Sequence, residues 1–308
     1  MSRFSSLDCL YMTNAKDDFT IYHGSGSATP GVKELREEYL RLERHELPSL
    51  EKKVIRFMPY RRERENMQRN TTFAIAHNVQ SLHAHKEDVE SDEVLTRADY
   101  LVLNETWMNS NDLVSINNYD LVYHKKREPR RTAGGVAIYR HIDCQTNAVA
   151  IPDVPNIEKL VRVEMGVGDI CLVSVNRGDR PMFVLGSVYV HPNVPFSKFK
   201  YLFSALATYC TWILGLIPDI DVDLEVPIVL LGDFNVDTKN HSEYAEFMEK
   251  EFNLKHHPME SPRTLGCTRI DHAFLRNINT ECMTYVSYFS YHRPILHQIT
   301  ENASIRPL

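Results

Sequence analysis

The chain has 308 residues, of which 43% are hydrophobic and 25% are charged, a composition typical of a folded protein with one large domain or two ordinary ones. No apolar run approaches the ~18 residues needed to span a bilayer, and the first residues lack the apolar core of a signal peptide. We therefore expect no membrane partner. The net charge of −6 does not indicate a nucleic-acid binder, although local basic patches could still steer one.

The six cysteines are scattered along the chain and include no CxxC pair. In a chain of this length, such a pattern predicts reduced, mostly buried thiols and an intracellular protein. It also argues against a zinc cluster.

Residues 1–70 are predicted to lie outside the globular body. The first 30 or so mix Ser, Gly, Asp and Asn without periodicity, which predicts a flexible arm. Residues 32–70 are rich in Glu, Arg, Leu and Lys, with apolar residues near helical spacing, so we expect one or two charged helices. The basic run at 61–64 predicts a solvated loop. The body is expected at 71–300, followed by a disordered tail at 301–308.

Short apolar runs follow one another through the body and predict strands. Helices are expected at 196–215 and 242–252, where apolar residues recur at helical spacing. The last strand is expected at 286–289. In chain order, the other strand-like runs are 72–76, 98–103, 134–139, 160–164, 170–175, 182–190, 228–231 and 263–274.

The most distinctive stretch is 226–237, in which four apolar residues lie between Pro227 and Gly232 and are followed by Asp233 and Asn235. The run predicts a strand buried on both faces. Taken alone, the polar residues favour a turn, because Asp and Asn cap backbone N–H groups. The alternative is an acid and an amide at the rim of a sheet, where they would hold water, metal or phosphate.

Similar polar residues follow other predicted strands, and their joint occurrence favours the second interpretation. Catalytic side chains gather at one edge of a sheet because strands fix them rigidly. Singly, each is equally well explained as a cap or a polar core residue. The residues concerned are Asn78, Glu105, Tyr189, Asp233 with Asn235, and His292 at strand ends, and Asp271 within a strand.

The residue types suit hydrolysis of a phosphate ester. Glu105 is a hard oxygen ligand suited to Mg²⁺. Asp233 can orient or deprotonate an attacking water that Asn235 helps to hold. His292, paired with Asp271, could stay protonated and donate to the developing negative charge.

Tyr189 could donate to the same oxygens. The chain has no GxSxG motif and no Walker-type glycine loop, so acyl transfer and nucleoside-triphosphate chemistry have no support. A second basic run is equally well explained as a solvated loop or as a phosphate contact. It includes Lys125, Lys126, Arg127, Arg130 and Arg131.

Over residues 71–299 the chain resembles the endonuclease/exonuclease/phosphatase superfamily, in the order HNVQSL, LNETW, SVYVHPN, LGDFNVD, RIDHAF and SYHRP. It is most similar to the endonuclease domains of LINE-type retrotransposons and of arthropod Helitron-type mobile elements. The resemblance implies an α/β (α+β) fold, a four-layer sandwich of two mostly antiparallel β-sheets flanked by helices. It also implies a Mg²⁺ or Mn²⁺ ion on Glu105 and Asn78, and substrate contacts by Asn193 and Thr264.

The function implied is that of a metal-dependent phosphodiesterase, foremost a DNA endonuclease that leaves a 3′-hydroxyl and works in the nucleus or else the cytoplasm. A phosphatase or an RNA-directed nuclease of the same superfamily is an alternative. Another is a nucleic-acid-binding module that has lost turnover. Three departures from the family pattern bear on this choice: Tyr291 replaces an Asp, Gln80 replaces an acid of abasic-site enzymes, and Asn193 lies one residue further from Tyr189 than is common.

Overall fold

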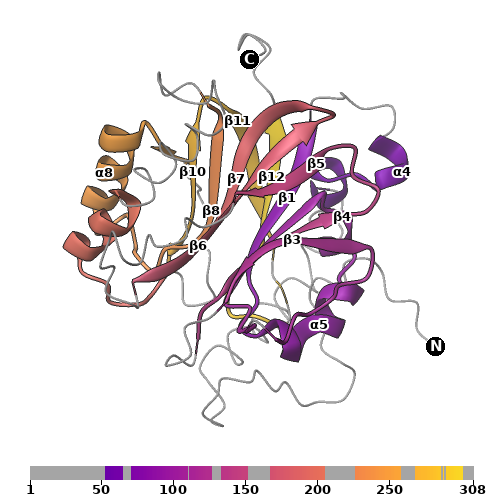
Figure 1. The fold of residues 1–308 in the computed structure, drawn as a ribbon, viewed down its shortest axis with the longest axis horizontal. Helices are drawn as coiled ribbons and strands as arrows, with labels where there is room; N and C mark the ends of the chain where they lie inside the picture. The colour runs from indigo at the N-terminus through magenta and orange to yellow at the C-terminus, as the bar shows by residue number, and fades with distance from the viewer. Residues whose placement is uncertain are drawn as a thin grey trace.

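Two six-stranded β-sheets face each other and form the body of the protein (Figure 1). The strand order is β11-β12-β1-β2-β4-β3 in the first sheet and β5-β6-β7-β8-β10-β9 in the second. One pair in each sheet is parallel, β1 with β2 and β7 with β8, and the other pairs are antiparallel. The prediction of two mostly antiparallel sheets is therefore confirmed.

This computed structural model describes residues 53–64, 71–109, 111–126, 133–151, 167–204, 226–257, 268–285, 287 and 289–300. The expected strand at 160–164, most of the second basic run and the predicted arm and tail lie outside these ranges. The strands of the first sheet are β1 (Thr71–Asn78), β2 (Tyr100–Asn104), β3 (Tyr119–Lys125), β4 (Val136–His141), β11 (Asn279–Thr284) and β12 (Ile295–Thr300). Those of the second are β5 (Asn147–Ile151), β6 (Gly168–Arg177), β7 (Arg180–Val190), β8 (Ile228–Asp233), β9 (Lys255–His256) and β10 (Asp271–Arg276).

Helices cover the outer face of each sheet. Against the first sheet lie α5 (Leu82–Ser91) and the short helix η1 (Leu95–Arg97), and α4 (Arg61–Arg64) lies near the start of β1. Against the second sheet lie α8 (Ser242–Phe252), at its predicted bounds, and helical residues 196–204. The four layers of the predicted sandwich are thus present.

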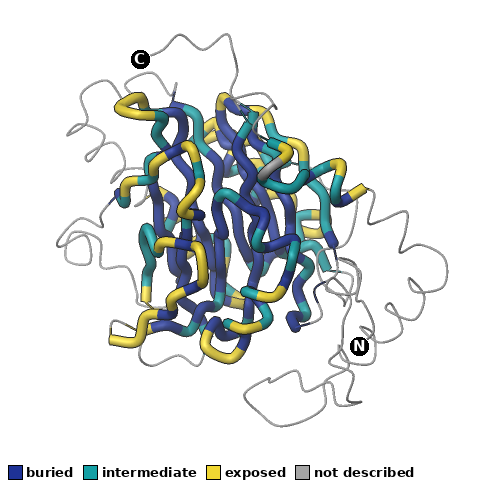
Figure 2. Tube along the Cα trace, turned by 90° about the vertical axis from the view of Figure 1, so that its right-hand side faces the viewer, coloured by how far each residue is buried: buried dark blue, intermediate teal, exposed yellow. Residues whose placement is uncertain are grey.

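Alternation along the central strands explains why both faces of each sheet are buried. In β1, Phe73 and Ile75 pack under α5, whereas Ala74 and Ala76 face the second sheet. Successive side chains of a strand point to opposite faces, so a continuous apolar run supplies two cores at once. Figure 2 shows the buried strands at the centre and the exposed residues in the connections.

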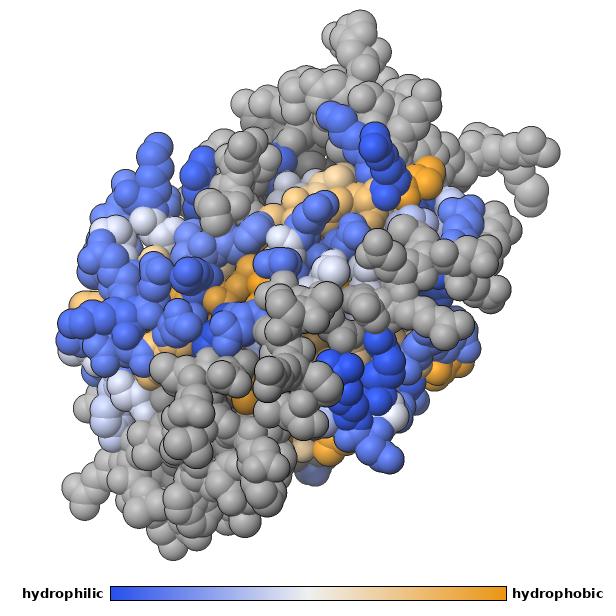
Figure 3. Space-filling view, turned by 90° about the horizontal axis from the view of Figure 1, so that it is seen from above, coloured by the Kyte–Doolittle hydropathy of each residue, from blue (hydrophilic) through white to orange (hydrophobic). Residues whose placement is uncertain are grey.

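Among the described residues on the face drawn in Figure 3, most are hydrophilic, and a band of hydrophobic residues crosses the middle. No helix in the described part of the chain is long and apolar enough to cross a membrane.

The end of the chain departs from the prediction. The strand expected at 286–289 is wrong: the described residues of that segment form no strand, and the segment joins β11 to β12. The strand β12 was overlooked because His297 and Gln298 interrupt its apolar pattern, yet His297 is fully buried. β3 and β5 were also overlooked, since their side chains are largely half-exposed and their sequences are mixed.

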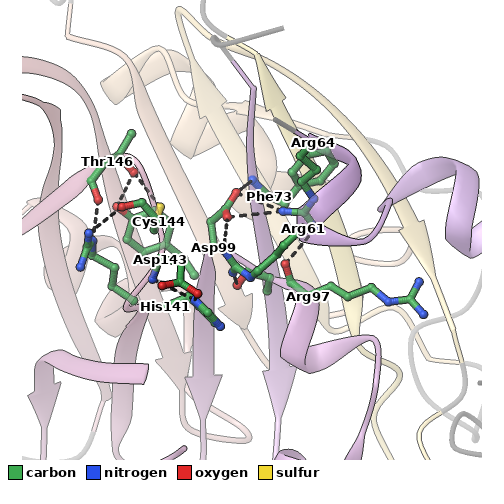
Figure 4. A network of polar contacts seen from close by, with 12 residues as sticks. Arg61, Arg64, Phe73, Arg97, Asp99, His141, Asp143, Cys144 and Thr146 are labelled. Carbon is green, nitrogen blue, oxygen red and sulfur yellow. Dashed lines mark hydrogen bonds and ion pairs between the residues drawn. The ribbon is translucent and has the colours of Figure 1, made fainter. Parts of the chain in front are cut away.

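Residues 53–64 pack against the body. Val54 and Met58 are buried in the core beneath the first sheet. Arg61 and Arg64 reach the Asp99 carboxylate, with Nη1–Oδ1 distances of 3.1 and 3.4 Å (Figure 4). The prediction of a solvated loop at 61–64 is therefore wrong, because these residues form the helix α4 and a half-buried carboxylate from the loop before β2 binds the guanidinium groups of Arg61 and Arg64.

Asp92, at the C-terminal end of α5, is a completely buried carboxylate. Its Oδ1 accepts hydrogen bonds from the backbone N–H groups of Val94 (2.8 Å) and Leu95 (3.0 Å), and its Oδ2 accepts one from the Tyr285 hydroxyl (3.2 Å). Burial raises the pKa of Asp92 to about 6, although these hydrogen bonds oppose the shift.

We expect Asp92→Asn to change how stability depends on pH. The folded protein holds the Asp92 proton more tightly than the unfolded chain, so the wild type loses unfolding free energy as pH rises from about 4 to about 6. A shift of about two pKa units corresponds to about 3 kcal/mol, and asparagine, which keeps the cap oxygen, does not titrate. Urea unfolding at pH 4, 5, 6 and 7 measures the difference. Parallel curves for the two proteins would contradict this assignment.

Candidate active site

Several polar side chains meet at one edge of the two sheets because of how the strands are paired. Asn78 and Asn104 are aligned at the carboxyl ends of the parallel strands β1 and β2, and Glu105 follows directly. In the second sheet, Asp233 at the end of β8 is aligned with Tyr189 of β7 on one side and with Asp271, the first residue of β10, on the other.

A close contact between the sheets lies beneath these carboxylates. The buried side chain of Asn104 donates from Nδ2 to the Val188 carbonyl (2.9 Å) and to the Ser187 Oγ (3.1 Å). Gly232 makes room for this contact, since a Cβ at that position would lie 1.9 Å from the Val188 oxygen and 3.0 Å from Asn104 Nδ2. The residues that precede Glu105 and Asp233 thus hold the two sheets together.

Asn78 links the two carboxylates. Its Nδ2 donates to Glu105 Oε1 (3.0 Å) and to Asp233 Oδ2 (2.9 Å), while its Oδ1 accepts the Gln80 N–H (3.2 Å). Glu105 has a left-handed backbone (φ 49°), which places its side chain beyond the strand end. Its other oxygen, Oε2, accepts a hydrogen bond from the Trp107 indole N–H at 3.4 Å.

Asp233 is buried beside other acids. Burial, together with the Asp271 and Glu105 carboxylates, raises the pKa of Asp233 to about 8, whereas His292 and the Asn235 N–H act in the opposite direction. The Asn235 N–H donates to Asp233 Oδ1 (2.9 Å), and the Asn235 side chain donates to the Val190 carbonyl (2.8 Å). The sequence of 226–237, taken alone, favours a turn in which Asp caps a backbone N–H group. Asp233 does cap the Asn235 N–H, and the same hydrogen bond orients the Asp233 carboxylate.

His292 and Asp271 form a buried pair. Both oxygens of Asp271 lie close to His292 Nδ1, at 2.9 and 3.1 Å, and Nε2 lies 3.8 Å from Asp233 Oδ2. Burial alone would lower the pKa of His292, but Asp271, Asp233 and Glu105 raise it to about 9. The imidazole is therefore a cation at neutral pH. His292 lies in the β11–β12 connection, not at the end of a strand as predicted.

Tyr189 completes this group of side chains. It is buried beside Glu105 and Asp233, and burial together with these carboxylates raises the pKa of its hydroxyl above the ordinary value. The hydroxyl is therefore a hydrogen-bond donor at neutral pH.

Only some of the predicted substrate-contacting residues lie in the part of the chain that the structure describes. Lys125 ends β3 and is aligned through Val136 of β4 with Asn104, so it lies at the same edge of the first sheet as Glu105. Lys126 is exposed next to it, and Asn193 is exposed in the turn after β7. Arg127, Arg130, Arg131 and Thr264 lie outside the described residues.

The donor set fits a divalent cation. Atoms of Asp233, Asp271 and His292 lie within 4.8 Å of one another, but a protonated His292 cannot donate a lone pair to a metal. Glu105 and Asp233 offer the carboxylate oxygens that Mg²⁺ and Mn²⁺ prefer, whereas Asn78 faces them with its Nδ2 donor and its oxygen accepts a backbone N–H. Three carboxyl groups meet one imidazolium here, and their mutual repulsion contributes to the raised pKa of Asp233; a bound cation would offset that repulsion.

Sequence reasoning missed the residues that support these side chains. Asn104 and Trp107 lie within the LNETW motif and Ser290 within SYHRP, yet the sequence predicts no role for them. The roles of Asn104 and Ser290 depend on hydrogen bonds to distant segments, whereas Trp107 bonds Glu105 two residues away. Their closeness in sequence to the predicted site residues Glu105 and His292 was the only signal that could have indicated these roles.

No protein-family model matches the sequence, and no curated protein matches it either. Solved structures do match. The endonuclease domain of TRAS1, a telomere-specific non-LTR retrotransposon, superposes with a TM-score of 0.52 at 12% identity, covering 75% of this chain and 98% of that one. The chain has the endonuclease/exonuclease/phosphatase fold.

Two further structures show the same architecture. An AP endonuclease from Archaeoglobus fulgidus matches with a TM-score of 0.51 at 14% identity, over 73% of this chain and 98% of that one. The human Nocturnin catalytic domain matches with a TM-score of 0.50 at 14% identity, over 77% and 95%. At these identities the likeness establishes the fold of the chain, and its chemistry has to be argued from its own residues.

We expect Mn²⁺ binding to change the fluorescence of Trp107, because its indole N–H bonds the carboxylate predicted to hold the metal. The chain has two tryptophans, and replacing the other one by Trp212→Phe isolates the signal. In that background, a saturable change in emission should disappear in Glu105→Gln. Asp237→Asn, a change in the loop after β8, is the matched control and should titrate normally. An unchanged titration in Glu105→Gln would show that the metal binds elsewhere.

Proposed function

We propose that this protein is a divalent-metal-dependent phosphodiesterase, foremost a DNA endonuclease of the mobile-element type that leaves a 3′-hydroxyl. The observation that carries the proposal is the buried group in which Asn78 joins Glu105 to Asp233, with the His292–Asp271 pair beside it. A deep cluster of acids facing one cation is a costly arrangement unless it serves binding or catalysis.

Each side chain has a role that its contacts support. Asp233, fixed through both oxygens by Asn235 and Asn78, orients an attacking water. In its ionised form, which higher pH or a bound cation favours despite the raised pKa of about 8, it accepts the proton of that water. The His292 imidazolium, held by Asp271, donates toward the negative charge that develops on the phosphoryl oxygens. The Tyr189 hydroxyl is a second donor for the same oxygens.

Glu105 would hold the metal. Asn78, which the resemblance implies as a second ligand, would support the site by orienting the Glu105 and Asp233 carboxylates, because its Nδ2 donates to both. Its oxygen accepts the Gln80 N–H. When bound, the ion neutralises charge on the phosphate and stabilises the leaving oxygen. The Asn78 amide donates to both acids and would therefore keep Glu105, which holds the metal, at a fixed distance from Asp233, which orients the water.

A nicking assay on supercoiled plasmid with Mg²⁺ or Mn²⁺ tests the proposal. We expect Asp233→Asn to lower the rate about 10³-fold, because the group that prepares the water is lost. His292→Gln should lower it about 10²-fold or more, since the cationic donor is lost. Asp237→Asn should retain wild-type activity. Equal nicking by all four proteins would remove the proposal.

The same preparations separate the alternatives. Nicked product that primes a DNA polymerase without further treatment carries a 3′-hydroxyl. Faster cleavage of RNA or of a phosphomonoester would indicate the RNA-directed nuclease or the phosphatase. Tight DNA binding without cleavage at any metal concentration would indicate a binding module. A mobile-element role would place the protein in the nucleus.

A further inference from the structure

The connection that carries His292 is bonded to the end of β1. The Ser290 hydroxyl donates to the Asn78 carbonyl (2.6 Å) and accepts from the His292 N–H (3.1 Å). His77 lies close to the other side of the same residue, with its Nε2 3.3 Å from the His292 carbonyl. Burial, followed by the charge of His292, lowers the pKa of His77 to about 3, so His77 is neutral and Nε2–H donates to that carbonyl.

Gln80 adds a contact of a different kind. Its side-chain oxygen Oε1 accepts the backbone N–H of Tyr291 at 3.1 Å, across 211 residues of sequence. Gln80 itself has a left-handed backbone (φ 47°), as does Ser81 (φ 94°). Such conformations cost of order 1 kcal/mol or more each and persist where the surroundings fix them. The turn after β1 is thus shaped so that the Gln80 amide meets the peptide that precedes His292.

Tyr291 takes part through its backbone. Its half-buried side chain packs against the apolar cluster under the first sheet, and its ring meets the His292 imidazole edge to face, with 6.1 Å between the ring centroids. Two of the three departures from the family pattern, Gln80 and Tyr291, therefore contact each other. The neutral Gln80 side chain accepts the Tyr291 N–H, whereas the family pattern has an acid at each of these two positions.

We propose that Gln80 is a positioning residue that, by holding the Tyr291 amide, sets the His292 imidazole between Asp271 and Asp233. The proposal rests on the proposed function, in which His292 acts on the phosphate. The competing explanation is that Gln80 only stabilises the turn. In that case its loss would lower stability without affecting His292.

Substitutions at Gln80 separate the two explanations. Gln80→Met keeps the length of the side chain but removes the acceptor, whereas Gln80→Glu keeps an acceptor oxygen. Gln80→Asn keeps the amide but is one methylene too short, and it replaces the methionine variant if that protein does not fold. Gln298→Met, a change of a half-buried glutamine on β12, is the matched control.

Three measurements are made on each variant. Amide hydrogen exchange across 287–294 reports the Tyr291 hydrogen bond, and the downfield Nδ1–H proton signal of His292, assigned by its loss in His292→Gln, reports the imidazole. We expect Gln80→Met to exchange about tenfold faster at Tyr291 and to broaden the His292 signal. Its kcat should fall about tenfold with KM within twofold, because the geometry of the reacting groups is lost and binding is not.

Gln80→Glu should restore the slow exchange and the sharp His292 signal, and Gln298→Met should behave as the wild type. Unchanged exchange in Gln80→Met would overturn the proposal, since the contact would be absent. Faster exchange with an unaffected His292 signal would also overturn it and leave Gln80 a structural role. If the wild type cleaves no phosphate ester, the proposed function fails, while exchange and the His292 signal still decide whether Gln80 positions the imidazole.

Discussion

The contact between Asn104 and the second sheet is the constraint on which the rest of the candidate site depends. Asn104 reaches across to the Val188 carbonyl, and Gly232 leaves the space that the contact needs. Because Glu105 follows Asn104 and Asp233 follows Gly232, this contact fixes the distance between carboxylates that belong to different sheets. A side chain at position 232 would clash with the Val188 carbonyl on the neighbouring strand β7 and crowd the Asn104 amide that bonds it.

Electrostatics explains why so close a group of acids can exist. Burial, followed by the nearby Asp271 and Glu105 carboxylates, raises the pKa of Asp233, and the imidazolium of His292 offsets part of this repulsion. Asn78 contributes neutral donors to two of the acids. The remaining excess of negative charge is what makes the centre suitable for a cation.

The centre combines rigid and irregular parts of the chain. Asn78, Tyr189, Asp233 and Asp271 lie on strands, whereas His292 lies on a connection. That connection is held to β1 through His77 and Ser290, and to Asp271 through the His292 side chain. Hydrogen bonds to both sheets thus fix the position of His292, although it does not lie on one of the strands.

The sequence by itself determined the buried strands around 71–78 and 228–233, the helix at 242–252 and the residue types of the centre, since these follow from local apolar patterns and motif order. It failed for β12, whose pattern is broken by a buried histidine, and for the basic run at 61–64, whose partner Asp99 is distant. The pairing of strands decided the rest. Asn78 meets Asp233 across 155 residues only because two sheets pack at one particular register, and local sequence carries no record of that distance.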